Sequence, residues 1–445
     1  MTGLRQPDNQ DPIMTTLQDI LDPRIDHSFK GFPHTSPPLR RSQIAAQNWR
    51  VLDGDLPLPL AVVKQQPLQH NLTWMQRFAS ERGLDMAPHG KTTMSPQLLK
   101  RQLDEGAWGL TFATVAQMRA GITAGARRLM IANQVITAVD LAGIQAMQRE
   151  LDGLRVVFLV DSLAQLALIE AWYLAHQDGA ALVRPFEVLL EIGVNGARTG
   201  CRTEADALAL AARIHAGPAC RLVGIECYEG QGATGQSEPD AAYAASLMQR
   251  VCDIALACEQ QGFFDTEEVL VTAGGSAIFD LVASWLKPRL SRPVRGLLRS
   301  GCYVTHDHGF YKRMVSAVNS RLHCTDGLQA AMEVWAAVQS CPEPGLAILA
   351  VGKRDISYDL DLPVPLAFCK PGDSVVTAAP ADWKINALND QHAYLRGSGP
   401  EHAALQVGDL VALGISHPCT TFDKWRWMPV VDENYRVCDA LVTCF

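Results

Sequence analysis

Between residues 84 and 308 the chain repeats one pattern: a short apolar run, a few small or polar residues, and then a segment of helical length. The helical segments carry Ala and Leu at i, i+3 and i+4 spacing, as amphipathic helices do. Apolar strands that alternate with such helices predict parallel βαβ units, and eight units in about 225 residues predict a (β/α)8 barrel. The eight apolar runs are residues 83–91, 108–115, 127–135, 154–162, 186–196, 221–230, 267–276 and 294–307.

The pattern changes after about residue 311, where shorter runs separated by turn residues replace the helical rhythm. This change predicts a second, mainly β domain over residues 311–445, after a barrel over 67–310. The run LPLAVV (58–63) predicts a strand within residues 43–66 that pairs with the β domain. Residues 1–42 are polar and contain proline without sustained periodicity, which predicts an N-terminal arm.

The composition of the chain indicates a globular protein and argues against some partners. Of the 445 residues 48% are hydrophobic and 19% are charged, so the chain can bury two compact cores. The formal net charge is −8, and no basic stripe with interleaved aromatic residues occurs, which argues against a nucleic-acid partner. The first twenty residues lack the apolar core of a signal peptide, and no run of eighteen apolar residues follows, so we expect a cytoplasmic protein without a membrane contact. The twelve cysteines are scattered singly, which predicts small buried residues rather than a disulfide framework.

Active sites of (β/α)8 barrels lie at the carboxyl ends of the strands, and Lys91 ends the first predicted strand. A partly desolvated lysine amine with a lowered pKa can form a Schiff base with a carbonyl cofactor. From its position alone, an ion pair with an acidic residue across the rim explains Lys91 equally well.

A glycine turn follows the seventh predicted strand and precedes a helix. Gly274 and Gly275 let backbone amides approach an anion, and Ser276 can donate a further hydrogen bond. Gly301 follows the eighth strand, and barrels often bind phosphate with the loops after strands seven and eight. A reactive lysine that faces a phosphate site indicates pyridoxal 5′-phosphate.

The stretch SHPCTTFDKW (416–425) holds half of a metal site. On an extended strand His417 and Cys419 would point to the same side, so that imidazole and thiolate could bind one ion. Two protein ligands leave positions for water and substrate, as in catalytic sites, and this ligand pair favours zinc over magnesium or calcium. Asp423 is a candidate acceptor for the imidazole. The alternative is a strand histidine bonded to a carbonyl beside a buried cysteine, and His306 with His308 is a competing metal pair that we interpret as structural.

The motifs APHGKTTM, EIGVNGARTG, CYEGQ, TAGGS, SGCYVTHDHG and SHPCTTFDKW occur in this order and together resemble the D-serine dehydratase / D-threonine aldolase family. These are fold-type III pyridoxal-phosphate enzymes with an alanine-racemase-type barrel and a β domain. The family more often has arginine where this chain has Ala87 and histidine where it has Gln231. EHAALQVGD (401–409) resembles a segment that precedes the metal motif in relatives, so we expect His402 near the site. The resemblance implies that Lys91 forms the Schiff base, that the metal binds His417 and Cys419, and that the cofactor contacts are His89, Arg198, Tyr228, Gly274, Gly275, Ser276, Gly301 and Cys302.

The resemblance implies a lyase dependent on pyridoxal phosphate and a divalent metal, with zinc preferred and manganese or magnesium open. We expect dehydration of D-serine or a related D-β-hydroxy amino acid to a 2-oxo acid and ammonia. The alternative is a D-threonine-type aldolase that forms glycine and an aldehyde, and an alternative of another class is a non-catalytic pyridoxal-phosphate-binding protein. The resemblance also implies a homodimer, and the size of the substrate's β-substituent stays open.

Overall fold

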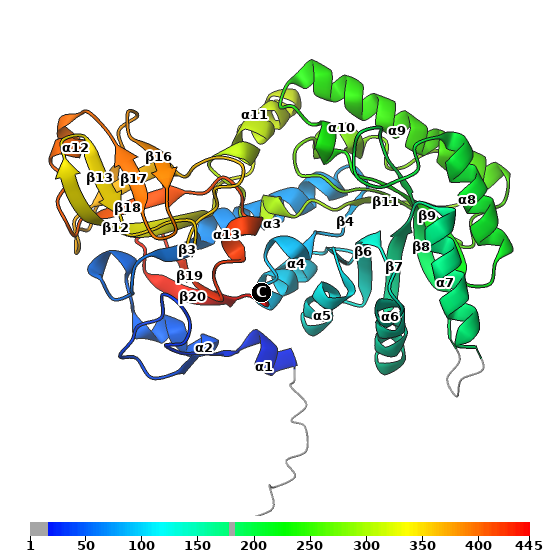
Figure 1. The fold of residues 1–445 in the computed structure, drawn as a ribbon, viewed down its shortest axis with the longest axis horizontal. Helices are drawn as coiled ribbons and strands as arrows, with labels where there is room; N and C mark the ends of the chain where they lie inside the picture. Colours follow the sequence, from blue (N-terminus) through cyan, green and yellow to red (C-terminus); the bar gives the residue numbers. More distant parts are fainter. Residues whose placement is uncertain (1–16, 178–182) are drawn as a thin grey trace, which may run out of the picture.

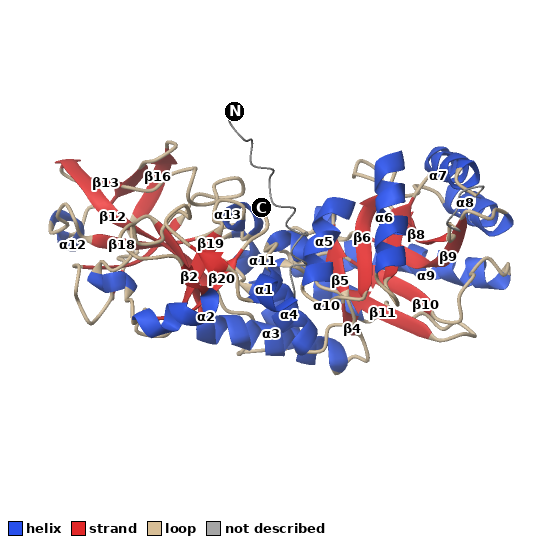
Figure 2. Cartoon of the chain, turned by 90° about the horizontal axis from the view of Figure 1, so that it is seen from below, coloured by secondary structure: helices blue, strands red, loops and turns tan. Residues whose placement is uncertain are grey.

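The computed structural model describes residues 17–177 and 183–445 (Figure 1). A barrel formed by the middle of the chain and a β domain formed mainly by its last third lie side by side along the long axis (Figures 1 and 2). The predicted architecture, a parallel barrel followed by a mainly β domain, is confirmed.

The barrel sheet has the strand order β4-β11-β10-β9-β8-β7-β6-β5, and every neighbouring pair is parallel. Its two edge strands meet as well, because Trp108 N–H donates to Met86 O at 2.8 Å and His89 forms a parallel bridge with Thr111. The sheet therefore closes. Its strands are β4 (Asp85–Met86), β5 (Leu110–Phe112), β6 (Arg128–Gln134), β7 (Arg155–Val160), β8 (Phe186–Ile192), β9 (Cys220–Cys227), β10 (Val269–Ala273) and β11 (Val294–Leu298).

Successive residues of the barrel strands belong alternately to two separate hydrophobic cores. A small cluster of buried residues from nearly every strand, including Met130, Val157 and Leu270, packs apart from the main core and fits the barrel interior. Their neighbours, such as Ile131, Phe158 and Val271, belong to the main core, which includes the buried faces of the helices. Because parallel strands are buried on both faces, their residues read as continuous apolar runs.

The helices that follow the strands begin at hydroxyl residues. The side chains of Thr114, Thr137, Ser162 and Thr203 each accept a hydrogen bond from the backbone three residues on, which satisfies a free N–H of the first turn. The helices of this region are α3 (Gln65–Ser80), α4 (Pro96–Asp104), α5 (Val115–Thr123), α6 (Ala138–Glu150), α7 (Leu163–Ala175), α8 (Glu204–Ala216), α9 (Ser237–Gln260), α10 (Phe279–Ala283) and α11 (Phe310–Leu322).

The β domain is built on the long strand β12 (Met332–Glu343), which pairs with β18, β3 and β13. β3 (Leu60–Lys64) precedes the barrel in sequence yet lies in this sheet, antiparallel to β12 and parallel to β19. The other elements are β13 (Leu346–Leu349), β14 (Val364–Cys369), β15 (Thr377–Ala378), β16 (Lys384–Leu388), β17 (Ala393–Arg396), α12 (Pro400–Ala403), β18 (Leu410–Gly414), α13 (Cys419–Phe422), β19 (Trp427–Val431) and β20 (Val437–Val442).

The described part of the N-terminal arm packs on the end of the chain. Arg41 forms an ion pair of 2.5 Å with Asp439 of β20, and the rings of Phe32 and Trp427 are 5.5 Å apart. Residues 1–16 lie outside the described part of the chain. The short elements here are α1 (Leu17–Leu21), β1 (Arg24–Ile25), β2 (Leu39–Arg40), α2 (Arg41–Ile44), η1 (Ala45–Gln47) and η2 (Val51–Asp53).

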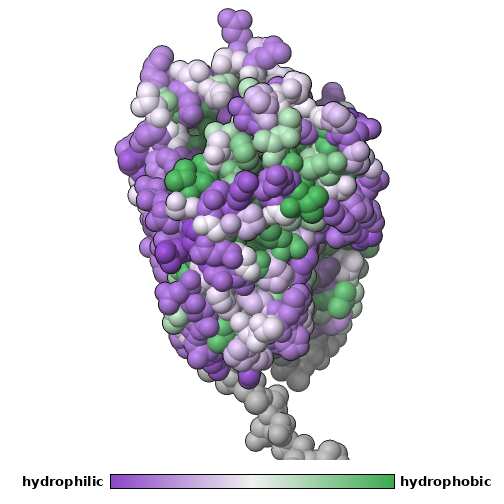
Figure 3. Space-filling model, turned by 90° about the vertical axis from the view of Figure 1, so that its left-hand side faces the viewer, coloured by the Kyte–Doolittle hydropathy of each residue, from purple (hydrophilic) through white to green (hydrophobic). Residues whose placement is uncertain are grey.

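The surface at the β-domain end is mostly hydrophilic, with hydrophobic residues in small patches (Figure 3). Across the residues that the structure describes, no helix is both long enough and apolar enough to cross a membrane.

Candidate active site

Lys91 lies on η3 (Gly90–Thr92), the turn directly after β4, and its side chain is exposed. A Cβ on Gly90 would come within 2.4 Å of the Phe112 ring, so only glycine lets this turn pack against β5. His89 precedes the turn, and its Nδ1 is buried without a hydrogen-bond partner. Burial and the nearby Lys91 charge hold the pKa of His89 well below its ordinary value. The imidazole is therefore neutral, with an unused polar atom beside the lysine.

Tyr228 and Arg198 stack at the ends of β9 and β8. The Arg198 guanidinium lies 4.4 Å from the centre of the Tyr228 ring, which is a cation–π contact. The Oε1 of Gln231 accepts a hydrogen bond of 3.2 Å from the backbone N–H of Arg198. Burial raises the pKa of Tyr228, so its hydroxyl stays protonated at neutral pH.

The glycine turn after β10 already binds one anion, the carboxylate of Glu229. The backbone N–H groups of Gly274 and Gly275 donate to its two oxygens at 3.0 and 2.8 Å. Glu229 is fully buried, and that burial raises its pKa. A phosphate that used these two amides would have to displace Glu229. Sequence reasoning missed this residue, although its position just past the end of β9 was a usable signal.

Ser276, Gly301 and Cys302 adjoin the turn. Gly301 N–H donates to Ser276 Oγ at 3.3 Å, and Ser300 Oγ donates to Gly275 O at 2.6 Å, so the loops after β10 and β11 are joined. A Cβ on Gly301 would come within 2.6 Å of Thr92 Oγ1 and 2.7 Å of His89 O. The backbone at Gly301 thus lies against the lysine turn with no space for a side chain.

A buried ion pair lies beneath the glycine turn. Arg299 donates to Glu226, and both side chains are nearly inaccessible to water. Arg299 also donates to Cys227 O at 3.1 Å. Burial outweighs the attraction of Arg299 and raises the pKa of Glu226 to about 7. This pair was not anticipated from the sequence.

His417 and Cys419 lie on the β domain, but not on an extended strand. Pro418 has helical angles, φ −57° and ψ −45°, and Cys419 begins the short helix α13. The prediction of an extended strand is therefore wrong, because Pro418 starts a helical turn instead. The two side chains still contact each other, through a hydrogen bond between the imidazole and the thiol.

Asp359 is the carboxylate that orients His417. Its Oδ2 lies 2.5 Å from His417 Nδ1, and its Oδ1 accepts a hydrogen bond of 2.6 Å from Thr420 Oγ1. The candidate from the sequence, Asp423, is exposed and pairs with Lys424 instead. Burial alone would lower the pKa of His417, but its hydrogen bonds with Cys419 and Asp359 raise it to about 9.

Cys419 connects the β domain to the lysine turn. Its Sγ lies 3.4 Å from Thr92 Oγ1 and 3.6 Å from Cys302 Sγ. The contact with Cys302 lowers the pKa of Cys419 and raises that of Cys302, so Cys419 loses its proton more readily than Cys302 does. Thr92 is the next residue after Lys91, so the candidate metal residues adjoin the candidate cofactor residues.

His402 lies elsewhere, which contradicts the expectation that it is near the site. Its Nε2 contacts Leu395 O at 3.3 Å and its ring packs against Trp383, within the outer part of the β domain around α12 (Figure 1). His306 and His308 are largely buried, which lowers the pKa of both imidazoles. Over the described ranges, no group of three or more His, Cys, Asp or Glu side chains is placed to hold a metal ion. A metal at His417 and Cys419 would therefore have two protein ligands from this chain.

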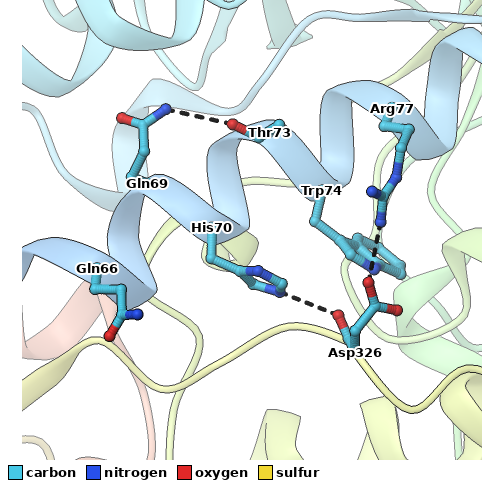
Figure 4. Close-up of a pocket in the computed structure, with 7 residues that line it drawn as sticks. All are labelled: Gln66, Gln69, His70, Thr73, Trp74, Arg77 and Asp326. Carbon is cyan, nitrogen blue, oxygen red and sulfur yellow. Dashed lines mark hydrogen bonds and ion pairs between the residues drawn. The ribbon is translucent and has the colours of Figure 1, made fainter.

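Figure 4 shows a cavity of about 380 Å³ on the outside of α3, away from these residues. His70 Nε2 contacts Asp326 O at 3.0 Å, and Arg77 pairs with the Asp326 carboxylate at 3.2 Å. None of the candidate cofactor or metal residues lines it, so it is not part of this site. Its lining is Gln66, Gln69, His70, Thr73, Trp74, Arg77 and Asp326.

Comparisons with known proteins find matches for both domains. Residues 63–291 match the family described as alanine racemase, N-terminal domain, and residues 331–431 match the putative serine dehydratase domain. The chain belongs to the family described as alanine racemase, N-terminal domain, because that match covers more than half of its length.

Two relatives show how far the similarity extends. The chain is 25% identical to the D-threonine aldolase of Arthrobacter sp. over 387 residues, which cover 84% of this chain and 89% of the relative. It is 30% identical to the D-threo-3-hydroxyaspartate dehydratase of Delftia sp. (strain HT23) over 159 residues, which cover 35% of this chain and 39% of the relative.

Solved structures share the fold. The D-threonine aldolase from Filomicrobium marinum matches with a TM-score of 0.73 at 20% identity, covering 89% of this chain and 97% of that one. The Delftia dehydratase matches with a TM-score of 0.67 at 20% identity, covering 88% and 98%.

Proposed function

We propose that this chain is a pyridoxal-phosphate- and metal-dependent dehydratase that converts D-serine or a related D-β-hydroxy amino acid to a 2-oxo acid and ammonia. The observation that carries the proposal is the 3.4 Å contact between Thr92 Oγ1, next to Lys91, and Cys419 Sγ. This contact would bring Lys91, which would act at Cα of the substrate, next to a metal on Cys419, which would act at Cβ. Loss of a β-hydroxyl requires both groups at neighbouring carbon atoms.

The residues at the barrel mouth fit the cofactor. The unpartnered Nδ1 of His89 is a feature that a bound ligand would use. We assign the covalent attachment to Lys91 and the ring contacts to His89, Arg198 and Tyr228. We assign the phosphate to the loops of Gly274–Ser276 and Gly301–Cys302, where it would displace Glu229 from the amides of Gly274 and Gly275. When bound, pyridoxal phosphate supplies an electron sink for the negative charge that develops at Cα.

His417 and Cys419 fit a divalent metal, because an imidazole and a thiol already in contact are backed by the Asp359 carboxylate. The softness of the thiolate favours zinc, and manganese or magnesium remain alternatives. A metal with two protein ligands keeps open positions and, as a Lewis acid, helps a hydroxyl to leave.

The chain's own groups then have separate tasks. Lys91 takes the proton from Cα of the substrate through Nζ. His89 stays neutral beside it and therefore does not repel the protonated amine. Water is lost across Cα–Cβ, and later addition of water releases ammonia, so no oxidant or reductant is needed.

Retro-aldol cleavage is the second candidate, favoured by the long match to a D-threonine aldolase. Here the β-hydroxyl would lose its proton and the Cα–Cβ bond would break, giving glycine and an aldehyde. The same residues could serve either reaction, since the bond aligned with the cofactor decides the outcome.

The deciding experiment incubates the cofactor-loaded protein with D-serine and D-threonine, with and without a chelator, and identifies the products. A 2-oxo acid and ammonia whose formation stops with chelator supports the dehydratase. Glycine and an aldehyde would replace it by the aldolase. No turnover of either substrate, with cofactor bound, would leave two readings: a substrate with another β-substituent, or the non-catalytic binding protein.

A further inference from the structure

The two thiols at the boundary between the domains are close enough to react with each other. Cys302 begins η5 (Cys302–Val304), the turn after β11, and Cys419 begins α13 of the β domain. Their sulfur atoms are 3.6 Å apart although 117 positions separate the residues in sequence. Both cysteines are free thiols.

Local geometry favours approach of the two sulfurs. A disulfide needs a sulfur–sulfur distance of about 2.0 Å, so the atoms must approach by roughly 1.6 Å, which side-chain rotation and a small shift of a turn can supply. Thr92 Oγ1 contacts both sulfurs, at 3.4 Å from Cys419 and 4.0 Å from Cys302, so no bulky side chain separates them.

The two thiols differ in exposure. Cys302 is only 6% exposed, whereas Cys419 is half-buried beside His417, and the Asp359 carboxylate next to them is exposed. A small oxidant can therefore reach Cys419 first, while Cys302 lies more deeply buried next to it. This is the arrangement of an oxidised and a resolving cysteine.

We propose that Cys302 and Cys419 form a reversible disulfide that competes with metal binding at Cys419. The oxidant is hydrogen peroxide. The Cys419 sulfur attacks the peroxide oxygen and becomes a sulfenic acid while water leaves; the Cys302 sulfur then attacks the Cys419 sulfur, the S–O bond breaks and a second water leaves. The pair loses two electrons and two protons, and a dithiol returns them.

The disulfide would have two effects. It would remove the thiolate that we assign to the metal, and it would join the barrel covalently to the β domain at the active site. The competition with metal rests on the proposed function, whereas the formation of the disulfide rests on the geometry alone. Bound zinc would protect the pair, because the sulfur that binds zinc is not free to attack the peroxide.

The test oxidises the full-length, cofactor-loaded protein with hydrogen peroxide, with zinc removed or added, and maps the peptides by mass spectrometry after alkylation of free thiols. In the zinc-free protein we expect a peptide pair that joins residues 302 and 419, is lighter by two hydrogen atoms, and disappears with dithiothreitol. At free zinc of about 100 times its Kd, the cross-link should form about a hundredfold more slowly.

Cysteine variants distinguish the proposed disulfide from the assignment of Cys419 to the metal. In Cys302→Ser, Cys419 should proceed to the sulfinic acid because it lacks its partner, whereas Cys324→Ser, at a half-buried cysteine outside the site, should keep the cross-link. Absence of the cross-link in zinc-free wild type, with Cys302 still alkylated, overturns the disulfide and leaves the proposed function standing. A cross-link that forms equally fast with zinc confirms the disulfide and contradicts the assignment of Cys419 to the metal.

Discussion

The candidate active site has two halves that are built differently. In the barrel half, Lys91, Tyr228 and Gly274 each follow a parallel strand, so the hydrogen bonds of a closed sheet fix their places. In the β-domain half, Asp359 and His417 lie in loops, and side-chain hydrogen bonds hold them together. The barrel half is a consequence of the fold, whereas the β-domain half depends on a few specific contacts.

The halves also differ in burial. Under the barrel mouth lie the buried pair of Glu226 and Arg299 and the fully buried Glu229. In the β-domain half the side chain of His417 is 20% exposed and that of Asp359 is 39% exposed. Substitutions in the barrel half should therefore affect both cofactor and stability, while those in the β-domain half should change metal binding with little loss of stability.

The largest expected effect follows from Lys91→Ala, which removes the residue to which we assign both the attachment of the cofactor and the proton transfer at Cα. We expect turnover to fall by at least about 10⁴-fold, the upper range for loss of a positioned proton-transfer group. The visible absorbance of bound cofactor should disappear as well. Lys100→Ala is the matched control, because Lys100 is a surface residue of α4 that pairs with Asp104. Activity that survived Lys91→Ala would contradict the mechanism.

Cys419→Ala tests whether the halves act separately. Loss of a thiolate ligand should release the metal and lower kcat about 10³-fold, since a metal Lewis acid contributes several kcal/mol. Cofactor absorbance should persist, because Lys91 and the glycine turns are intact. Metal content and cofactor absorbance are measured on the same variant, and the substitution of an exposed residue, His392→Ala, is the control. Loss of metal and cofactor together would mean that the halves are not independent.

Arg299→Met probes the burial of the barrel half. The change leaves Glu226 buried without its cation, and removal of one partner of a buried ion pair costs about 3–5 kcal/mol of unfolding free energy. Arg354→Met removes the exposed pair with Asp390 and should cost less than about 1 kcal/mol. Urea unfolding of both variants measures the difference. Equal costs would contradict the view that burial distinguishes the halves.

The same contrast explains what could be predicted from the sequence. The barrel half was accessible because the strand–helix pattern repeats eight times and places Lys91 and the glycine turn at strand ends. The contact of His417 with Asp359 joins loop residues 58 positions apart, and no periodicity marks such a contact. Nor did the sequence reveal that Pro418 starts a helical turn, or that His402 packs against Trp383.

The smallest expected effect comes from Asp359→Asn, which retains the size of the side chain but weakens its hydrogen bond with His417. We expect zinc affinity to fall 10- to 100-fold, the usual cost of losing a carboxylate that orients a metal-binding imidazole. Asp423→Asn, the exposed aspartate four residues after Cys419, should change affinity less than about twofold, within the range of surface substitutions. Competition with a chelator measures both affinities, and cofactor absorbance should be unchanged in both variants. If Asp423→Asn weakened zinc binding as much as Asp359→Asn, the general negative charge of this loop, rather than the directed hydrogen bond of Asp359, would control the metal.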